Sequence, residues 1–147
     1  EMRPMLAALC GGAMDGGIAA GALQWPLPGI YNITCQFGEP DAIRGLPHKG
    51  VDIAAPEGTP ILAAHDGTVL ISGWNDSYGN QVLLDNGTGL STRYAHMIET
   101  AVGAGEAVTA GQIIGYVGST GDSTGNHLHF EIMVNGVRGN PLLSFGI

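Results

Sequence analysis

The sequence predicts an all-β fold: a compact antiparallel domain of the sandwich or barrel-like kind, with few or no long helices. Glycine supplies 25 of the 147 residues while only 12% of the residues are charged. This balance is typical of short strands joined by tight turns, because glycine readily adopts the positive φ that such turns need. About eight apolar runs of strand length also recur at the spacing expected of such domains.

The expected strands are separated by turn-forming sequences such as His-Asp-Gly at 65–67 and Asp-Asn-Gly at 85–87. They comprise residues 30–34, 61–64, 67–72, 81–85, 90–97, two strands within 106–117, and 127–134. A chain of this length can form one domain with a continuous core.

Two prolines in Trp25-Pro26-Leu27-Pro28-Gly29 mark the expected start of the folded domain, because proline prevents helix and favours extended chain. We therefore divide the chain into 1–24, a linker or poorly ordered N-terminal segment, and 25–147, the folded domain. The run from 5 to 22 is too glycine-rich for a membrane-spanning helix, so membrane insertion by this domain is not expected. Glu1 suggests a piece of a longer polypeptide.

The charge pattern argues against nucleic acid as a partner. The formal charge is −8, with five basic residues against 13 acids and no basic patch. Cys10 and Cys35 are far apart and lack CxxC spacing, so they could form one disulfide or remain two thiols. Neither cysteine belongs to a recognisable zinc motif.

The segment His127-Leu128-His129-Phe130-Glu131-Ile132-Met133-Val134 alternates apolar with other residues and predicts a strand with one face in the core. Both imidazoles then point to the other face, two residues apart. They could serve one site, although a polar outer face carrying two histidines by chance would look the same.

A metal site can be assembled from histidine and carboxylate residues elsewhere in the chain. His48 and Asp52 are separated by three residues where a loop enters a strand, and His129 can add a third ligand. Catalytic zinc sites commonly use three such ligands and leave one position for water. Taken singly, each residue has a structural alternative: a loop histidine, a turn-stabilising acid and an exposed strand residue.

The ordered motifs also resemble a known family. His48-x-x-x-Asp52, Tyr94-Ala95-His96 and His127-Leu128-His129 are similar to the motifs of the lysostaphin and LytM-type zinc endopeptidases of the M23 family. The glycine-rich stretch 118–126 and Tyr78-Gly79-Asn80 extend the similarity, which covers residues 25–147.

The resemblance implies that His48, Asp52 and His129 bind Zn²⁺ and that His96 and His127 are catalytic. It also implies an antiparallel β domain of LytM type with a groove over the metal. The implied activity is hydrolysis of peptides in bacterial peptidoglycan, at a stem-peptide cross-link or an interpeptide bridge. The expected location is extracellular or in the cell envelope, either secreted or carried by a phage or conjugation machine.

Four other residues are assigned on weaker grounds. Tyr94, expected on the strand face of His96, could hydrogen-bond a bound peptide, and Asn80 could contact substrate; packing and turn formation are their alternatives. Glu131 is expected to be a solvated strand residue rather than a partner of a metal ligand. His65, which matches no motif, is expected at the surface.

Two other functions compete with hydrolysis. A non-catalytic relative could bind peptidoglycan or activate another hydrolase, but such relatives lose metal ligands, and all five positions are present here. A lipoyl- or biotinyl-type carrier needs a modifiable lysine on an exposed turn. Lys49 is the only lysine, and it lies inside the proposed metal motif.

Overall fold

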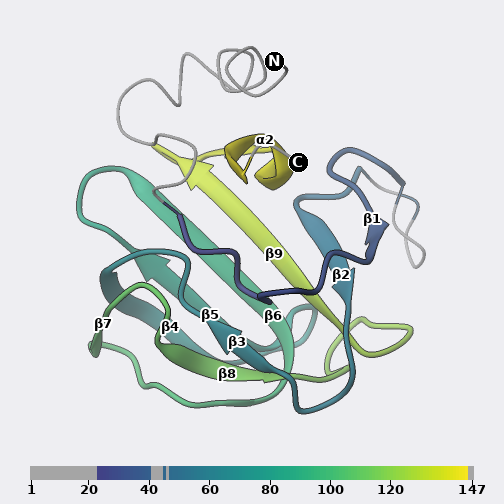
Figure 1. The fold of residues 1–147 in the computed structure, drawn as a ribbon, viewed down its shortest axis with the longest axis horizontal. Coiled ribbons are helices and arrows are strands. Elements are labelled where there is room, and N and C mark those ends of the chain that lie inside the picture. Colours follow the sequence, from purple (N-terminus) through teal and green to yellow (C-terminus); the bar gives the residue numbers. More distant parts are fainter. Residues whose placement is uncertain (1–22, 41–44, 46, 146–147) are drawn as a thin grey trace.

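The computed structural model describes residues 23–40, 45 and 47–145, and within them the regular secondary structure is almost entirely antiparallel β (Figure 1). The strands are β1 (Ile33–Cys35), β2 (Val51–Ala54), β3 (Pro60–Leu62), β4 (Gly67–Asn75), β5 (Gly79–Asp85), β6 (Leu90–Thr100), β7 (Ala107–Val108), β8 (Ile113–Val117), β9 (His127–Val134) and β10 (Val137–Gly139). One short helix, α2 (Pro141–Phe145), follows them.

The main sheet has the strand order β1-β2-β9-β6-β5-β4-β7, with β10 on β9. β3 pairs with β8, and β8 in turn pairs with β6, so this pair branches from the main sheet. All these pairings are antiparallel. The predicted fold class is therefore confirmed.

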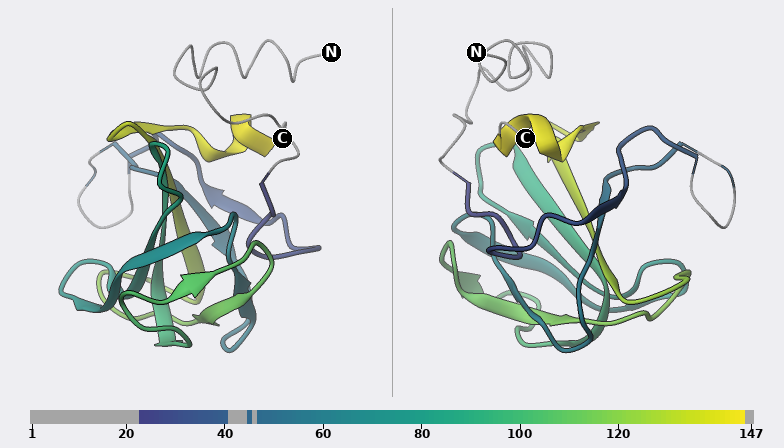
Figure 2. Two further views of the ribbon diagram at one scale, coloured as in Figure 1. Left: turned by 90° about the vertical axis from the view of Figure 1, so that its left-hand side faces the viewer. Right: turned by 45° about the vertical axis from the view of Figure 1, so that its right-hand side comes forward.

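The core lies between the main sheet and a layer made by β3, β8 and the segment 23–32. Figures 1 and 2 show these elements across one face of the sheet. Leu128 and Phe130 of β9 meet Ile61 of β3 and Ile114 of β8 in one buried cluster. Each of these side chains is fully buried, so the apolar face of β9 is covered as its alternation predicted.

The N-terminal part of the described chain belongs to this core. Leu23 is 8% exposed, and the backbone N–H of Gln24 donates to the carbonyl of Ala64. Trp25 stacks on Tyr31 and meets Phe145 of α2 edge to face. Leu23 and Gln24, which the prediction assigned to the linker, therefore pack against the folded domain. The other residues of the predicted linker, 1–22, lie outside the described residues.

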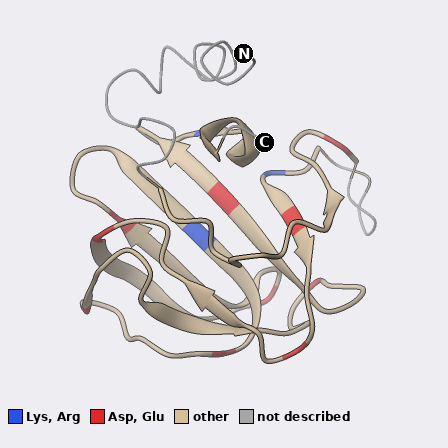
Figure 3. Ribbon diagram, in the orientation of Figure 1, with Lys and Arg blue, Asp and Glu red and all other residues tan. Residues whose placement is uncertain are grey.

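Most predicted strands match a strand of the structure, with shifts of a few residues at their ends. β1 begins three residues later than the segment 30–34 predicted, and β10 had no counterpart in the prediction. In the described residues no helix is long and apolar enough to cross a membrane. Figure 3 shows acidic residues spread over strands and loops. Oε1 of Glu131 in β9 lies 3.2 Å from Nη1 of Arg93 in β6.

Candidate functional site

The candidate site lies on the face of the sheet opposite the core, where β2 and β9 run side by side. Asp52 of β2 is paired with His129 of β9, and both point away from the core because their neighbours in sequence point into it. Cys35 of β1 is paired with Asp52 on its other side. Strand pairing therefore puts three residues with metal-binding side chains in one row.

His48 reaches this row from the loop before β2. The approach requires Gly50, because a Cβ atom there would lie 2.2 Å from the carbonyl oxygen of Phe130. Between the buried residues His48 and Gly50, Lys49 is exposed. The close backbone contact thus holds the loop against β9 and turns His48 toward the sheet.

Three ligand atoms converge at the centre of the site. Nε2 of His48 lies 3.1 Å from Oδ1 of Asp52, and Nδ1 of His129 lies 3.0 Å from each of these two atoms. Ligands ~2.0–2.2 Å from a tetrahedral zinc are about 3.3–3.6 Å apart, so side-chain movements of a few tenths of an ångström would fit the ion. The structure therefore brings together the three predicted ligands.

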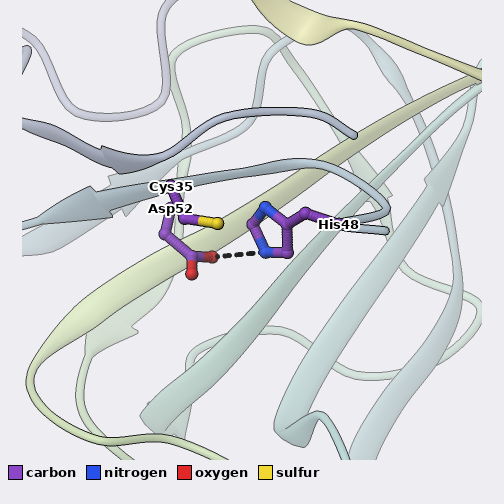
Figure 4. A group of neighbouring side chains, drawn as sticks. All are labelled: Cys35, His48 and Asp52. Carbon is purple, nitrogen blue, oxygen red and sulfur yellow. Dashed lines mark ion pairs between the residues drawn. The ribbon is translucent and has the colours of Figure 1, made fainter. Parts of the chain in front are cut away.

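Cys35 adds a sulfur to the edge of the site. Its Sγ and one ligand atom each of His48 and Asp52 lie within 4.8 Å of one another. Figure 4 shows these three side chains next to one another. Cys10, the other cysteine, lies outside the described residues, so the predicted alternatives of a disulfide and two thiols stay open.

Glu131 contradicts its prediction as a solvated residue. It is fully buried, and its Oε2 accepts a hydrogen bond of 2.8 Å from Nε2 of His129. Burial would raise the pKa of Glu131, but this bond and the nearby cations lower it to about 2. Alternation had placed Glu131 on the correct face; the partners that bury it come from other strands and were not visible in the local sequence.

The two carboxylates act on His129 from opposite sides. Burial disfavours the charged imidazole, yet hydrogen bonds to Asp52 and Glu131 outweigh it and raise the pKa of His129. Burial would likewise raise the pKa of Asp52, and hydrogen bonds with His129 and His48 instead hold it well below its usual range. The same negative charge would stabilise a bound cation.

His127 borders the three ligand atoms with one nitrogen free. Its Nδ1–H donates to the carbonyl of Gly125 at 2.8 Å, with Oγ of Ser123 at 3.2 Å. Nε2 therefore carries the lone pair, and it lies 3.5 Å from Oδ1 of Asp52. This nitrogen can take up a proton beside the ligands.

His96 reaches the site by a break in strand geometry. Alternation predicted that His96 shares the face of Tyr94 and that Met97 takes the other, but His96 has φ 61° and Met97 is buried in the core. The left-handed residue turns the imidazole out of the core face, and its ring centroid lies 4.8 Å from that of His127.

The protonation of His96 is also fixed by its surroundings. Its Nδ1–H donates to the carbonyl of Thr120 at 2.7 Å, which leaves the lone pair on Nε2. Burial lowers the pKa of His96 to about 4, although the Thr120 carbonyl favours the charged form. His96 is therefore a neutral acceptor near neutral pH.

Tyr94 is not placed to meet a substrate, contrary to its predicted role. It is fully buried, where the hydroxyl accepts from the backbone N–H of Ala64 at 2.9 Å and donates to Oγ1 of Thr92 at 2.7 Å. Burial raises the pKa of this hydroxyl. Tyr94 lies on the core face because the regular alternation of strand faces continues through it and is broken at His96.

His65 is buried as well, so its prediction as a surface residue is wrong. It is 6% exposed, and Nδ1–H donates to the carbonyl of Asp66 while Nε2 accepts from Oγ1 of Thr92 at 2.9 Å. Burial lowers the pKa of His65. With Tyr94 and Thr92 it forms a chain of hydrogen bonds within the core.

Asn80 is the second residue of β5 and supports the loop beside His96. Its side-chain amide donates to the carbonyls of Met97 and Ile98, and its backbone N–H donates to Oγ1 of Thr120. These contacts use the amide nitrogen and not the amide oxygen of the side chain, and substrate contact by Asn80 stays a prediction.

Comparison with known proteins identifies the family of this arrangement. The model of the family described as "Peptidase family M23" matches residues 46–141, which include all five predicted metal-binding and catalytic residues. The chain belongs to peptidase family M23. The resemblance predicted from the motifs is thereby confirmed.

Curated relatives of this M23 chain are much longer proteins. It is 45% identical over 95 residues to "DD-carboxypeptidase/endopeptidase Mpg" of Neisseria meningitidis, covering 65% of this chain and 22% of the relative. It is 37% identical over 123 residues to "Peptidoglycan DD-endopeptidase ShyA" of Vibrio cholerae, covering 81% and 28%. The chain thus spans about a quarter of the length of these relatives.

Solved M23 structures share the fold. The catalytic domain of the antimicrobial peptidase lysostaphin from Staphylococcus simulans has a TM-score of 0.73 and 37% identity, covering 80% of this chain and 93% of that chain. A zinc-containing peptidase from Vibrio cholerae has a TM-score of 0.74 and 31% identity, covering 82% and 38%.

The donor set of this M23 chain suits a metal ion. In neutral His129 with its proton on Nε2 toward Glu131, Nδ1 of His129 and Oδ1 of Asp52 would present lone pairs to each other at 3.0 Å. Such atoms repel unless a proton or a cation lies between them. Imidazole nitrogen and carboxylate oxygen are both good ligands of Zn²⁺.

Proposed function

We propose that this chain is a zinc-dependent endopeptidase that hydrolyses peptide bonds of bacterial peptidoglycan. The observation that carries the proposal is the convergence of His48 Nε2, Asp52 Oδ1 and His129 Nδ1 within 3.1 Å, beside two imidazoles with free Nε2 atoms. A zinc ion held by these three atoms would polarise a peptide carbonyl and lower the pKa of a water molecule to ~7.

His127 is proposed as the general base. Its Nε2 carries a lone pair beside Asp52, so it can accept the proton of the attacking water and return it to the nitrogen of the leaving amine. The Gly125 carbonyl, which accepts from Nδ1–H, would stabilise the imidazolium formed in between.

His96 is proposed to orient the attacking water. Because Nδ1–H donates to Thr120, the free Nε2 is an acceptor and can take a hydrogen bond from that water. The alternative role, donation to the developing oxyanion, would need a second proton on this ring. The geometry favours the first role.

The substrate class is inferred from the relatives. ShyA and its Vibrio cholerae homologue ShyC carry the name peptidoglycan DD-endopeptidase. We propose that this domain cleaves a stem-peptide cross-link or an interpeptide bridge, outside the cell or within the cell envelope. It would act as one part of a longer polypeptide, secreted or carried by a phage or conjugation machine.

Digestion of purified peptidoglycan tests the proposal. Sacculi with direct cross-links and sacculi with glycine bridges would be incubated with the zinc-loaded protein, and new amino termini identified by mass spectrometry. We expect peptide cleavage in one cross-link type and none with His129→Ala. Soluble fragments of unchanged peptide composition, or equal cleavage by His129→Ala, would reject the proposed activity.

A binding-only relative makes a different prediction in the same experiment. It would sediment with sacculi and release no new amino termini, with or without zinc. The presence of all five motif residues favours hydrolysis over this alternative.

A further inference from the structure

The ring of His129 is held from behind by a buried carboxylate. We propose that Glu131 is a positioning residue that selects Nδ1 of His129 as the metal-binding nitrogen, and that Tyr78 couples this residue to His96. The inference rests on the metal site proposed above. It concerns how the site is held in place and not which bond is cleaved.

The first step of the argument is the hydrogen bond between Glu131 and His129. A carboxylate can only accept, so the 2.8 Å contact requires the proton of the neutral imidazole to sit on Nε2. Nδ1, 3.0 Å from the ligand atoms of His48 and Asp52, is then the nitrogen whose proton a metal ion can replace, because Nε2–H stays bound to Glu131. A hydrogen bond of this kind orients a ligand and raises its basicity.

The second step is that Glu131 is kept as an anion and cannot turn away. Its Oε1 accepts from Nη1 of Arg93 and from Nε of Arg138, both at 3.2 Å, and its Oε2 also accepts from the hydroxyl of Tyr78 at 2.7 Å. The side chain is fully buried. Two cations from β6 and β10 therefore compensate the buried charge and fix the carboxylate plane.

The third step concerns Tyr78, which touches both halves of the site. Its hydroxyl binds the same Oε2 that accepts from His129, and its backbone carbonyl accepts from the N–H of His96 at 2.7 Å. His96 is the residue with φ 61°, so this bond supports the left-handed conformation that turns its ring toward the site. Arg93 covers the Tyr78 ring at 4.6 Å.

The turn that carries Tyr78 is itself well fixed. Oδ1 of Asn75 accepts from the backbone N–H groups of Ser77 and Tyr78 at 2.8 and 3.0 Å. Through the Tyr78 hydroxyl, the turn between β4 and β5 contacts Glu131, which holds the proposed ligand His129. Through the Tyr78 carbonyl, the same turn contacts His96. We infer that the turn sets the separation of His96 from His129.

Zinc affinity and the ring tautomer of His129 test the inference without relying on activity. Affinity would be measured by competition with a chelator, and the tautomer by ¹⁵N NMR of histidine-labelled, zinc-loaded protein. For Glu131→Leu we expect a loss of zinc affinity of ~10–100-fold. Glu131→Gln keeps an acceptor for Nε2–H, so it should recover most of that loss while losing stability, because both arginines lose their counter-ion.

Tyr78→Phe is the second variant, since it removes one hydroxyl and leaves the backbone carbonyl in place. It should weaken zinc binding less than Glu131→Leu and keep the proton of His129 on Nε2. Glu99→Leu is the matched control, because Glu99 is an exposed glutamate of β6. Its zinc affinity and spectrum should equal those of the parent.

The outcomes separate this inference from the proposed function. A parent protein that binds no zinc would reject the metal site itself. A parent that binds zinc, with Glu131→Leu and Glu131→Gln both binding it equally well through Nδ1 of His129, would reject the positioning role alone. Should Glu131→Leu fail to fold, Tyr78→Phe decides instead: weaker zinc binding than in the parent supports the positioning role, and zinc affinity equal to that of the parent rejects it.

Discussion

The hydrogen bonds of individual imidazoles divide the site into ligands and helpers. His129 offers Nδ1 to the metal position, whereas His96 and His127 keep Nδ1–H bound to main-chain carbonyls and leave Nε2 free. Residues of one chemical type can thus have different roles, because each ring is held by a different partner.

His96→Ala and His127→Ala should retain zinc but lose activity. Neither ring lies among the three converging ligand atoms, and removal of a group that moves or orients a proton costs ~10²–10⁴-fold in rate. Elemental analysis and peptidoglycan digestion of the same preparations provide the two measurements. Loss of zinc from either variant would instead make that histidine a ligand.

Cys35→Ser should leave the zinc content unchanged. His48, Asp52 and His129 already supply three ligand atoms, and Cys35 lies beside this set on the edge of the sheet. Metal analysis after dialysis against equal zinc concentrations measures the effect, with His129→Ala as the variant that loses metal. A Cys35→Ser protein without zinc would show that the thiol belongs to the essential ligand set.

With His65→Gln, the free energy of unfolding should fall less than in the parent as the pH is lowered. The folded-state pKa of His65 lies below the ~6.5 of an unfolded chain, so the unfolded state binds more protons as pH falls. This contribution is fully present above pH ~6.5 and is lost as pH falls through the folded-state pKa. Glutamine can still donate to Asp66 and accept from Thr92.

Urea unfolding at pH 7.5 and pH 5, with a chelator present for both proteins, measures this difference. The free energy of unfolding should fall more between the two pH values in the parent than in His65→Gln. Equal decreases in the two proteins would show that His65 is not a source of the acid sensitivity.

Side-chain burial was the hardest feature to predict at this scale. His65 and Glu131 are polar residues with partners in distant parts of the chain, such as Thr92 and Arg93. Their types and spacing gave no sign of those partners. The three ligand candidates could be selected because a motif of known chemistry contained them.

At the scale of elements, the loop 118–126 connects the two helper histidines. It provides the Thr120 carbonyl for His96 and the Gly125 carbonyl for His127. The loop packs directly on the turn between β4 and β5: a Cβ atom on Gly121 would lie 2.3 Å from the backbone nitrogen of Gly79. This contact is between backbone atoms of the loop and of the turn, and it sets the position of both imidazoles.

Gly121→Ala should therefore destabilise the domain and lower its activity. Gly121 has φ +73°, which costs a non-glycine residue about 1–2 kcal/mol, and the clash with Gly79 adds overpacking of about 1–3 kcal/mol. Gly58→Ala is the control, because Gly58 has φ +86° and nothing near its Cβ position. It should show the backbone cost alone, measured by urea unfolding.

Equal destabilisation by the two substitutions would show that the loop can move away from the turn. In that case the imidazoles would not depend on the contact, and the activity of Gly121→Ala should equal that of Gly58→Ala. Digestion of peptidoglycan at a temperature where both variants are folded separates the two results.

The elements were predicted well where one face of a strand is apolar along its whole length. β9 is the example, because Leu128, Phe130 and Ile132 all enter the core. β6 was predicted to its correct start, but the left-handed His96 reverses the faces that follow it. Local alternation cannot show such a reversal, since the supporting carbonyl belongs to Tyr78 in another hairpin.

For the whole molecule, the proposed metal joins β9 to the loop and strand that precede it by about half the chain. His48 and Asp52 come from one region and His129 from another, so metal binding should stabilise the folded state. Free zinc at 100 times its dissociation constant adds about 2.7 kcal/mol. For a domain of this size that raises Tm by roughly 5–10 °C.

Calorimetry with zinc and with a chelator measures this effect. His129→Ala should unfold at the same temperature in both conditions, because one ligand is missing. An equal rise in Tm in the variant would place the stabilising metal at another site.

The fold class was predictable because turns and strand lengths are encoded locally, while the branch of β3 and β8 over the sheet was not. That branch depends on the pairing of residues such as Ile61 and Gly115, which are far apart in sequence. The site residues could be predicted from their motifs. Their burial could not, because it depends on packing between distant parts of the chain.

Lys49 offers a position for chemical labelling beside the proposed metal ligands. It is the only lysine in the chain, and it is exposed next to the buried His48. Amine-selective coupling would therefore attach a fluorophore at a single side chain, one residue from a proposed ligand, with the α-amino group as the other reactive amine. A fluorophore on Lys49 could report cation uptake optically.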